Sequence, residues 1–210
     1  MKRIVVGMTG ASGAIYGIRF LEVLSTMDIE THLVISEAAE KTIELETPWT
    51  MKQVKDLAHT CHENKNIGAS IASGSFLTDG MVVIPCTIKT LSSVANSYND
   101  NLLARAADVT IKEKRNLVLV VRETPLHKGH LRLMMAAADL GATILPPVPA
   151  FYTHPRTIDD VVNQLVGKVL DTFHIEHNLF RRWGSAETDR AVAGKAQNEY
   201  VQLKKSRAKD

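Results

Sequence analysis

The chain has little of several features that define other classes of protein. Only 5% of its 210 residues are aromatic and its formal net charge is +2, so neither stacking side chains nor excess positive charge predicts binding of nucleic acid. Its two cysteines, Cys61 and Cys86, are too few for a disulfide framework, which indicates a reducing compartment. No segment approaches the ~20 apolar residues of a membrane span, and the first apolar run breaks at Gly7, too early for a signal peptide. We therefore expect a soluble, cytoplasmic protein.

Short apolar segments instead alternate with segments of helical periodicity. We expect strands at residues 3–7, 32–35, 81–84, 117–121 and 142–145. Helices are expected at about 12–27, 36–46, 87–97, 100–114, 127–139 and 158–173, with short helices and a connection over 50–75. This alternation is typical of βαβ units with a parallel sheet. It predicts one α/β domain over residues 1–184, followed by a polar C-terminal tail at 185–210.

The helix expected at 158–173 has the clearest pattern. Its apolar residues repeat at helical spacing and form one stripe: Ile158, Val161, Val162, Leu165, Val166, Val169, Leu170 and Phe173. Thr157 is a suitable cap for its start. Lys168 lies at the edge of the stripe, so its ammonium either reaches a cleft beside the sheet or snorkels at the surface.

Each expected strand ends in a polar turn. The carboxyl ends of parallel strands share one edge of a sheet, where ligands bind. The turn Gly7-x-x-Gly10-x-x-Gly13 lies between a strand and a helix, where backbone N–H groups can meet a phosphate. Its spacing differs from the dinucleotide fingerprint, and the second strand ends in Ser36 rather than a carboxylate, although Glu37 follows. The hydroxyls between Thr87 and Ser93 either support a phosphate site or cap a helix.

Two charged clusters carry possible chemistry. Arg122 can clamp a phosphate with two hydrogen bonds, and the adjacent Glu123 can deliver or accept a proton. The alternative is a surface ion pair at a strand end. Glu46, after the second expected helix, is either part of the site or a solvated acid at the helix end.

Three pairs of histidines have i,i+3 spacing: His59 with His62, His127 with His130, and His174 with His177. None has the third ligand and the catalytic glutamate of a recognisable zinc motif. We therefore expect no metal site.

Nine segments together resemble the UbiX/Pad family of flavin prenyltransferases. They are Gly7–Ala14, Ser36 with Ala38-Ala39, Glu44–Thr47, Ser73–Phe76, Pro85–Leu91, Arg105–Val109 with Lys112-Glu113, Leu117–Pro125, Pro146–Tyr152 and Arg182-Trp183. They run in the family's order from residue 3 to about 184. A series of matches in this order is much more specific than any one glycine motif.

The resemblance implies a flavodoxin-like Rossmann fold that binds FMN. It implies transfer of a dimethylallyl group from dimethylallyl monophosphate to reduced FMN, at N5 and then C6, without a metal. The prenylated flavin would then serve a UbiD-type decarboxylase. The resemblance also implies a homo-oligomer, a dodecamer with sites at subunit interfaces, in which Lys112 can come from a neighbouring copy.

The resemblance also assigns roles to individual residues. The flavin contacts would be Gly10, Ala11, Ser12, Ser36, Thr87, Ile88, Lys89 and Thr90, together with Arg122. The prenyl phosphate would be held by Lys112, Arg122, Tyr152 and Lys168, and Trp183 would shelter the prenyl group. Glu123, Glu46 and Ser12 would be catalytic. Some relatives have arginine in place of Lys168, and these two cations differ in hydrogen-bond geometry.

Three alternatives stay open. One is a decarboxylase that acts directly on hydroxyarylic acids. Another is a flavin-dependent cysteine decarboxylase, but Pro85-Cys86-Thr87-Ile88-Lys89-Thr90 replaces that family's Pro-x-Ser-Ala-Asn-Thr run, and its catalytic histidine is absent from the first segment. The third is a non-catalytic flavin carrier, which would not need the predicted cluster of cations.

Overall fold

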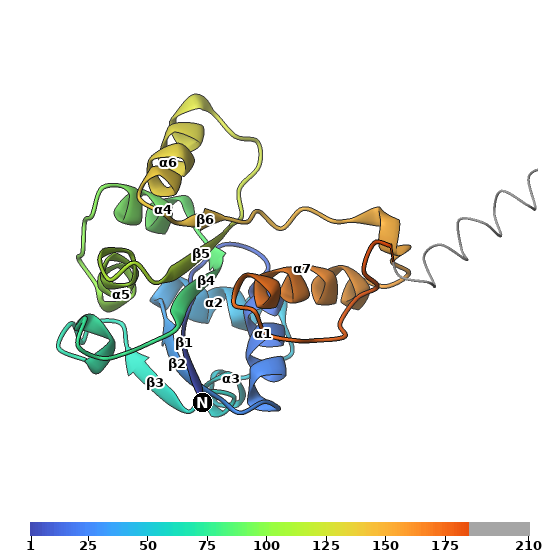
Figure 1. Cartoon of the computed structure of the whole chain (residues 1–210), viewed down its shortest axis with the longest axis horizontal. Coiled ribbons are helices and arrows are strands. Elements are labelled where there is room, and N and C mark those ends of the chain that lie inside the picture. Colours follow the sequence, from blue (N-terminus) through green and yellow to red (C-terminus); the bar gives the residue numbers. More distant parts are fainter. Residues whose placement is uncertain (185–210) are drawn as a thin grey trace, which may run out of the picture.

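The computed structural model describes residues 1–184, so the predicted tail at 185–210 lies outside the described residues. A parallel sheet forms its centre (Figure 1). The strands are β1 (Lys2–Met8), β2 (Ile29–Ile35), β3 (Thr60–Glu63), β4 (Gly80–Cys86), β5 (Asn116–Val121) and β6 (Thr143–Ile144). Their order, β3-β2-β1-β4-β5-β6, is that of a doubly wound Rossmann sheet. Without β3, the order matches that of flavodoxin. The predicted α/β fold is confirmed.

Helices cover both faces of this sheet. On one face lie α1 (Ala14–Ser25), α2 (Glu37–Glu46), α3 (Met51–Asp56) and α7 (Ile158–Thr172). On the other lie α4 (Ile88–Ala95), α5 (Leu102–Lys112), α6 (Lys128–Asp139) and the short η1 (Ser70–Ala72). Successive strand side chains point to opposite faces: Ile4 and Val6 pack with the first group, and Val5 with the second. Two apolar layers result, which explains the almost wholly apolar strands.

The strand β3 was not predicted. Its four residues, Thr60-Cys61-His62-Glu63, pair with β2 at the edge of the sheet. Three of them are exposed, so the segment lacks the apolar alternation that identifies a strand. The segment forms a strand because it pairs with β2, whereas its own sequence pattern does not predict a strand.

An extended arm, residues 145–157, leads away from β6 to the start of α7 (Figure 1). It contains the short helix η2 (Phe151–Thr153). Most of the predicted stripe of α7 packs in the same core as α1, but Ile158 is 79% exposed. The prediction for Ile158 was wrong, because the first turn of α7 extends beyond α1. Among residues 1–184, no helix is long and apolar enough to cross a bilayer.

Candidate active site

A cavity of about 890 Å³ lies at the carboxyl ends of four neighbouring strands. Its wall includes Gly10 after β1, Ser36 after β2, His62 in β3 and Thr87 after β4. The chain leaves β1 and β4 toward opposite faces of the sheet, so this is the switch point where doubly wound folds bind ligands. Of the predicted flavin contacts, five line this cavity: Gly10, Ser36, Thr87, Lys89 and Thr90.

Two helices begin at this cavity. Ser36 caps α2, with its Oγ accepting a hydrogen bond from Ala39 N at 3.2 Å. Thr87 caps α4, with its Oγ1 accepting from Thr90 N at 3.2 Å and donating to Thr90 Oγ1 at 3.1 Å. Of the hydroxyls between Thr87 and Ser93, Thr87 is therefore the helix cap, whereas Ser93 Oγ donates to Lys89 O at 3.2 Å within α4. A cap does not exclude a ligand, since the positive end of each helix dipole still faces the cavity.

Thr9 fixes the loops after β1 and β4 to each other. Its Oγ1 donates to Pro85 O at 2.7 Å and accepts from Thr87 N at 2.9 Å. At Gly10 the first turn of α2 comes so close that an added Cβ would lie 2.5 Å from the Cβ of Ala38. Glycine at this position is therefore needed for the close packing of the loop after β1 against α2.

The start of α1 is capped by a carboxylate from a distant helix. Glu46 Oε2 accepts hydrogen bonds from Gly13 N at 2.7 Å and from Ala14 N at 3.3 Å. Gly13, at φ 101°, provides no side-chain cap of its own. Partial burial raises the pKa of Glu46, but hydrogen bonds from Ser12, Gly13 and Ala14, together with the charge of Arg122, outweigh it and leave the pKa below its usual value. Glu46 is therefore an anion at a helix N-terminus.

Arg122 also acts on Tyr16, in the first turn of α1. Burial raises the pKa of Tyr16, and the charge of Arg122 opposes that rise. The backbone of Arg122 is held beside the end of β4, because its backbone N–H donates to Cys86 O at 3.0 Å. The structure thus brings together three predicted site residues, Ser12, Glu46 and Arg122. It adds Tyr16, which no motif in the sequence identified.

A second group of predicted residues lies on the arm and α7. The rings of Tyr152 and Trp183 meet edge to face, with centroids 5.4 Å apart. Lys168 Nζ lies 3.5 Å from Asp171 Oδ2, and Arg182 binds both oxygens of Asp171, at 2.8 and 3.1 Å. Burial raises the pKa of Asp171, but Arg182 and then His177 outweigh it and leave the pKa lowered. Asp171 therefore fixes two cations beside the aromatic pair.

Comparison with known proteins identifies the family. The family model described as Flavoprotein matches residues 1–170. A flavin prenyltransferase UbiX of Escherichia coli K12 is 59% identical over 189 residues, which cover 89% of this chain and all of that protein. The chain belongs to the UbiX family of flavin prenyltransferases. The resemblance seen in the sequence is confirmed, and the chain is a transferase.

Two solved structures of similar proteins agree with this assignment. The crystal structure of AnUbiX (PadA1) in complex with FMN and dimethylallyl pyrophosphate superposes with a TM-score of 0.86 at 47% identity, over 88% of this chain and 98% of that one. A dodecameric FMN-dependent Ubix-like decarboxylase from Escherichia coli O157:H7 gives a TM-score of 0.85 at 50% identity, over 87% of this chain and all of that one.

Other residues predicted for this prenyltransferase are not in the cavity wall. Ala11 and Ser12 continue the Gly10 loop, and Ile88 begins α4. Glu123 follows Arg122, but its side chain is exposed and its Oε1 accepts from Thr124 N at 3.0 Å. A single chain therefore leaves the side chain of Glu123 open to solvent.

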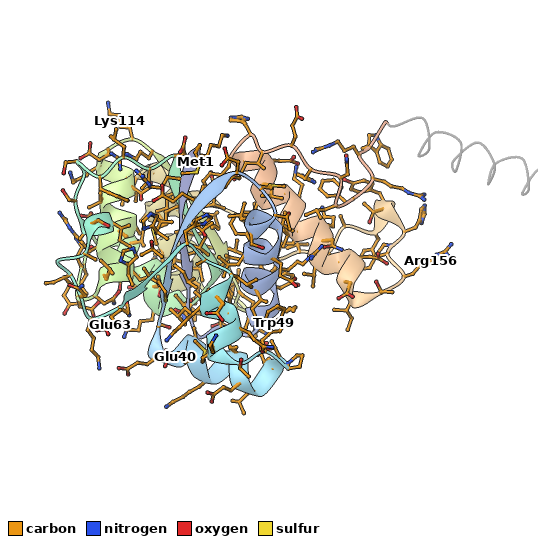
Figure 2. The ribbon with its side chains drawn as sticks, turned by 90° about the horizontal axis from the view of Figure 1, so that it is seen from below. Met1, Glu40, Trp49, Glu63, Lys114 and Arg156 are labelled. Carbon is orange, nitrogen blue, oxygen red and sulfur yellow. The ribbon has the colours of Figure 1, made fainter. Side chains whose placement is uncertain are left out.

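Lys112 lies at the opposite edge of the sheet. It ends α5, just before β5 begins at Asn116, and it pairs with Glu113. Figure 2 shows the nearby Lys114 on the same side of the molecule as Met1, opposite Glu40 and Glu63. Within one chain, Lys112 therefore does not join the cluster around Arg122.

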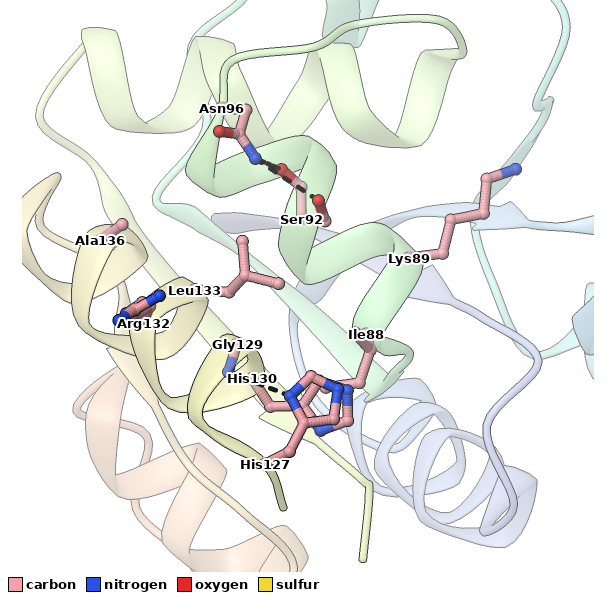
Figure 3. A pocket seen from close by; sticks show the side chains of 10 residues that line it. All are labelled: Ile88, Lys89, Ser92, Asn96, His127, Gly129, His130, Arg132, Leu133 and Ala136. Atoms are coloured by element: carbon pink, nitrogen blue, oxygen red, sulfur yellow. Dashed lines mark hydrogen bonds between the residues drawn. The ribbon is translucent and has the colours of Figure 1, made fainter. Parts of the chain in front are cut away.

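A further cavity, of about 650 Å³, lies between α4 and α6 (Figure 3). The rings of His127 and His130 lie in its wall, tilted by 33° to each other with centroids 3.5 Å apart. Lys89 lines this cavity as well as the first. Residues 1–184 contain no group of three or more His, Cys, Asp and Glu side chains placed to hold a metal ion.

Proposed function

We propose that this flavin prenyltransferase holds FMN with its phosphate in the carboxyl-edge cavity and its ring toward Ser12, Glu46 and Arg122. The observation that carries this proposal is the cavity itself, where the N-termini of α2 and α4 meet the loop at Gly10. These groups fit a phosphate, since N–H groups and helix dipoles bind anions. Reduced FMN would supply the nucleophilic positions N5 and C6 to the reaction.

The donor in this proposal is dimethylallyl monophosphate. AnUbiX was crystallised with FMN and dimethylallyl pyrophosphate, which supports an allylic phosphate as the ligand class. Breaking the carbon–oxygen bond leaves a phosphate with close to two negative charges. Arg122, Lys168 and the Tyr152 hydroxyl would stabilise that charge. Glu123 would give its proton to the departing oxygen, and Phe151 and Trp183 would keep water away from the allylic carbon.

The assembly completes this proposal. Because Lys112 lies at the far edge of its own sheet, it would have to come from a neighbouring copy. A similar protein of Escherichia coli O157:H7 is a dodecamer, and we infer the same assembly here. The product would pass to a UbiD-type decarboxylase in the cytoplasm, and residues 1–184 would form the single domain that does the chemistry.

The test is anaerobic incubation of the protein with reduced FMN and dimethylallyl monophosphate, followed by mass spectrometry of the bound flavin. We expect the flavin to gain one five-carbon unit. A parallel reaction with the diphosphate measures donor choice, and a reaction without donor is the blank. Unchanged FMN, with carbon dioxide released from an aromatic acid, would support a decarboxylase instead. Two similar structures that are 50% and 42% identical to this chain are named as decarboxylases, the one from Escherichia coli O157:H7 and phenylacrylic acid decarboxylase from Aquifex aeolicus.

A further inference from the structure

A line of three ionisable side chains runs along one face of the sheet to the cavity. Glu30 Oε1 lies 2.8 Å from His32 Nε2, and His32 Nδ1 lies 2.9 Å from His62 Nε2. Glu30 stands near the amino end of β2, His32 is only 4% exposed, and His62 lines the cavity. The line therefore joins the amino half of the sheet to the ligand cavity.

The two imidazoles meet edge to edge. Their ring planes differ by only 17° and their centroids are 5.2 Å apart, while the facing nitrogens are 2.9 Å apart. A face-to-face stack would not bring two nitrogens this close, so the nitrogens lie between nearly coplanar rings. This is the geometry of an N–H···N hydrogen bond. The proton in that bond belongs to either histidine, depending on charge.

Glu30 sets the direction of the hydrogen bonds along this line of side chains. A hydrogen bond from Arg3 and another from His32 lower the pKa of Glu30 to about 2, so the carboxylate only accepts. In the neutral line, His32 donates through Nε2, its Nδ1 accepts from His62 Nε2, and Nδ1 of His62 has no proton. One added proton reverses the middle bond: His32 then donates through both nitrogens, and His62 presents an N–H at Nδ1.

Nδ1 of His62 is available to a ligand. It has no hydrogen-bond partner among residues 1–184. It is also not one of the unpaired polar side-chain atoms of these residues that are buried away from solvent. His62 pairs with Val34, so its side chain lies on the same face of the sheet as Val34, the face that α4 and α5 cover. The helix α4 is one of the two that begin at the cavity. Burial, and then the nearby His32, lower the pKa of His62, which favours the neutral line when no anion is present.

We propose that His62 is a phosphate-binding residue of this cavity, and that Glu30 and His32 are positioning residues that supply its Nδ1–H when the phosphate dianion of FMN binds. Binding of FMN therefore takes one proton from solvent: the proton is added to the histidine line, and no bond of the ligand breaks. A bare Nδ1 would repel the dianion, whereas an N–H makes a charge-assisted hydrogen bond with it. This inference rests on the proposed function, because it takes FMN as the ligand.

Other charged groups around the line do not replace the histidine. Arg3 binds Glu30 at 2.8 Å and lies over the ring of Phe76. Lys65 is paired with Glu37 at 2.7 Å and Lys55 lies 3.9 Å from Glu40. The charged residues that line the cavity are Glu37, Glu40, Lys55, Glu63, Lys65, Lys89 and Asp100. The set contains nearly as many lysines as carboxylates, so it has almost no net charge. We therefore expect the added proton to be taken up by the histidines and not by these carboxylates.

The experiment is isothermal titration of the full-length, flavin-free protein with oxidised FMN. It is done at about pH 8, where the phosphate is the dianion, in two buffers of different ionisation enthalpy. We expect uptake of about one proton for each FMN bound. His62→Gln should bring the uptake close to zero and weaken FMN roughly tenfold or more. Glu30→Gln should reduce the uptake while His62 is retained.

Two controls separate this result from general damage. His59→Gln changes a histidine that bonds Thr31 and is not in the cavity wall, so it should leave the uptake unchanged. Riboflavin, which lacks the phosphate, should bind without uptake. Equal uptake with riboflavin, or unchanged uptake in His62→Gln, would overturn the inference while leaving the proposed function intact. If FMN does not bind at all, the proposed function fails and this inference fails with it.

Discussion

The carboxyl edge of the sheet and the arm hold two sets of site residues in different ways. At the sheet edge, Thr9 links two loops by hydrogen bonds of 2.7 and 2.9 Å, and Glu46 caps α1 from 33 positions along the chain. Tyr152 on the arm is held by one aromatic contact and Lys168 on α7 by one carboxylate, and Phe151 and Trp183 are each 73% exposed. The first set is fixed by hydrogen bonds within a single chain, and the second set has few such contacts.

The two sets of residues are assigned to different ligands, FMN at the sheet edge and the prenyl phosphate on the arm and α7. The groups assigned to FMN are preorganised by backbone hydrogen bonds and helix starts, so one chain can bind the flavin. The groups assigned to the prenyl phosphate are spread over Arg122, the arm and the far edge of the sheet, so they need neighbouring copies to converge. The comparison therefore predicts that substitutions in the two regions affect different ligands.

The largest effect is expected at Glu123, where the two regions meet. Glu123→Gln keeps the size of the side chain but cannot donate a labile proton. We expect single-turnover prenylation to fall by roughly two orders of magnitude, with FMN still bound. Glu176→Gln removes another exposed acid near α7 and is the control. A normal rate with a lowered melting temperature would show that Glu123 has only a structural role, as the acceptor of the hydrogen bond from Thr124 N.

On α7, Lys168→Ala should weaken binding of the prenyl phosphate without weakening binding of FMN. A hydrogen bond to a charged group contributes about 1.5–3 kcal/mol, so we expect KM for the donor to rise about tenfold or more. Lys52→Ala removes an exposed lysine that is also paired with an acid, Asp56, and should change neither ligand. An equal loss of both ligands in Lys168→Ala would contradict the separation of the two regions.

At the sheet edge, Ser12→Ala should slow prenylation several-fold while FMN still binds. The hydroxyl of Ser12 helps to lower the pKa of Glu46, so its loss raises that pKa without changing the backbone N–H groups. Rapid-quench kinetics and FMN titration measure the two effects. Ser25→Ala removes a hydroxyl at the other end of α1, where it donates to Glu22 O. If both variants react at the parent rate, Ser12 has no part in the chemistry.

The smallest effect concerns stability. Glu46→Gln should lower the free energy of unfolding by about 0.5 kcal/mol near neutral pH, since the carboxylate caps α1 but is exposed to screening solvent. The pKa of Glu46 is lowered by folding, so its contribution is present above the ordinary glutamate pKa of about 4.3 and is lost as the pH falls through the lower folded value.

Urea unfolding at several pH values measures this difference. Parent and variant should converge in acid. Glu44→Gln, a solvated acid on the same helix, should match the parent throughout. A gap between parent and Glu46→Gln that persists at low pH would rule out the carboxylate as the cap.

Much of this fold can be predicted from local pattern, because the strands and helices that were predicted carry their own signals. Ser36, Thr87 and Thr157 cap the helices that the sequence placed after them. The strand β3 has no such signal, since it is polar and owes its conformation to pairing with β2.

The site was harder to predict, because its contacts are not local. Its glycines and hydroxyls follow the strands and were found. The position of Glu46 at the start of α1, the approach of Tyr16 to Arg122 and the binding of Arg182 by Asp171 depend on packing between distant segments. The line from Glu30 to His62 crosses two strands, one of which was missed.

The contact between Gly10 and Ala38 also limits how this family can diverge. A Cβ at position 10 would lie 2.5 Å from the Cβ of Ala38 and 2.9 Å from its carbonyl carbon. Because backbone is involved, a smaller residue at position 38 would not relieve the overlap. A side chain at position 10 can therefore be accommodated only if the whole first turn of α2, which Ser36 caps, moves away. We therefore expect position 10 to remain glycine whatever residue stands at position 38, and a library that randomises residue 10 alone should return only glycine.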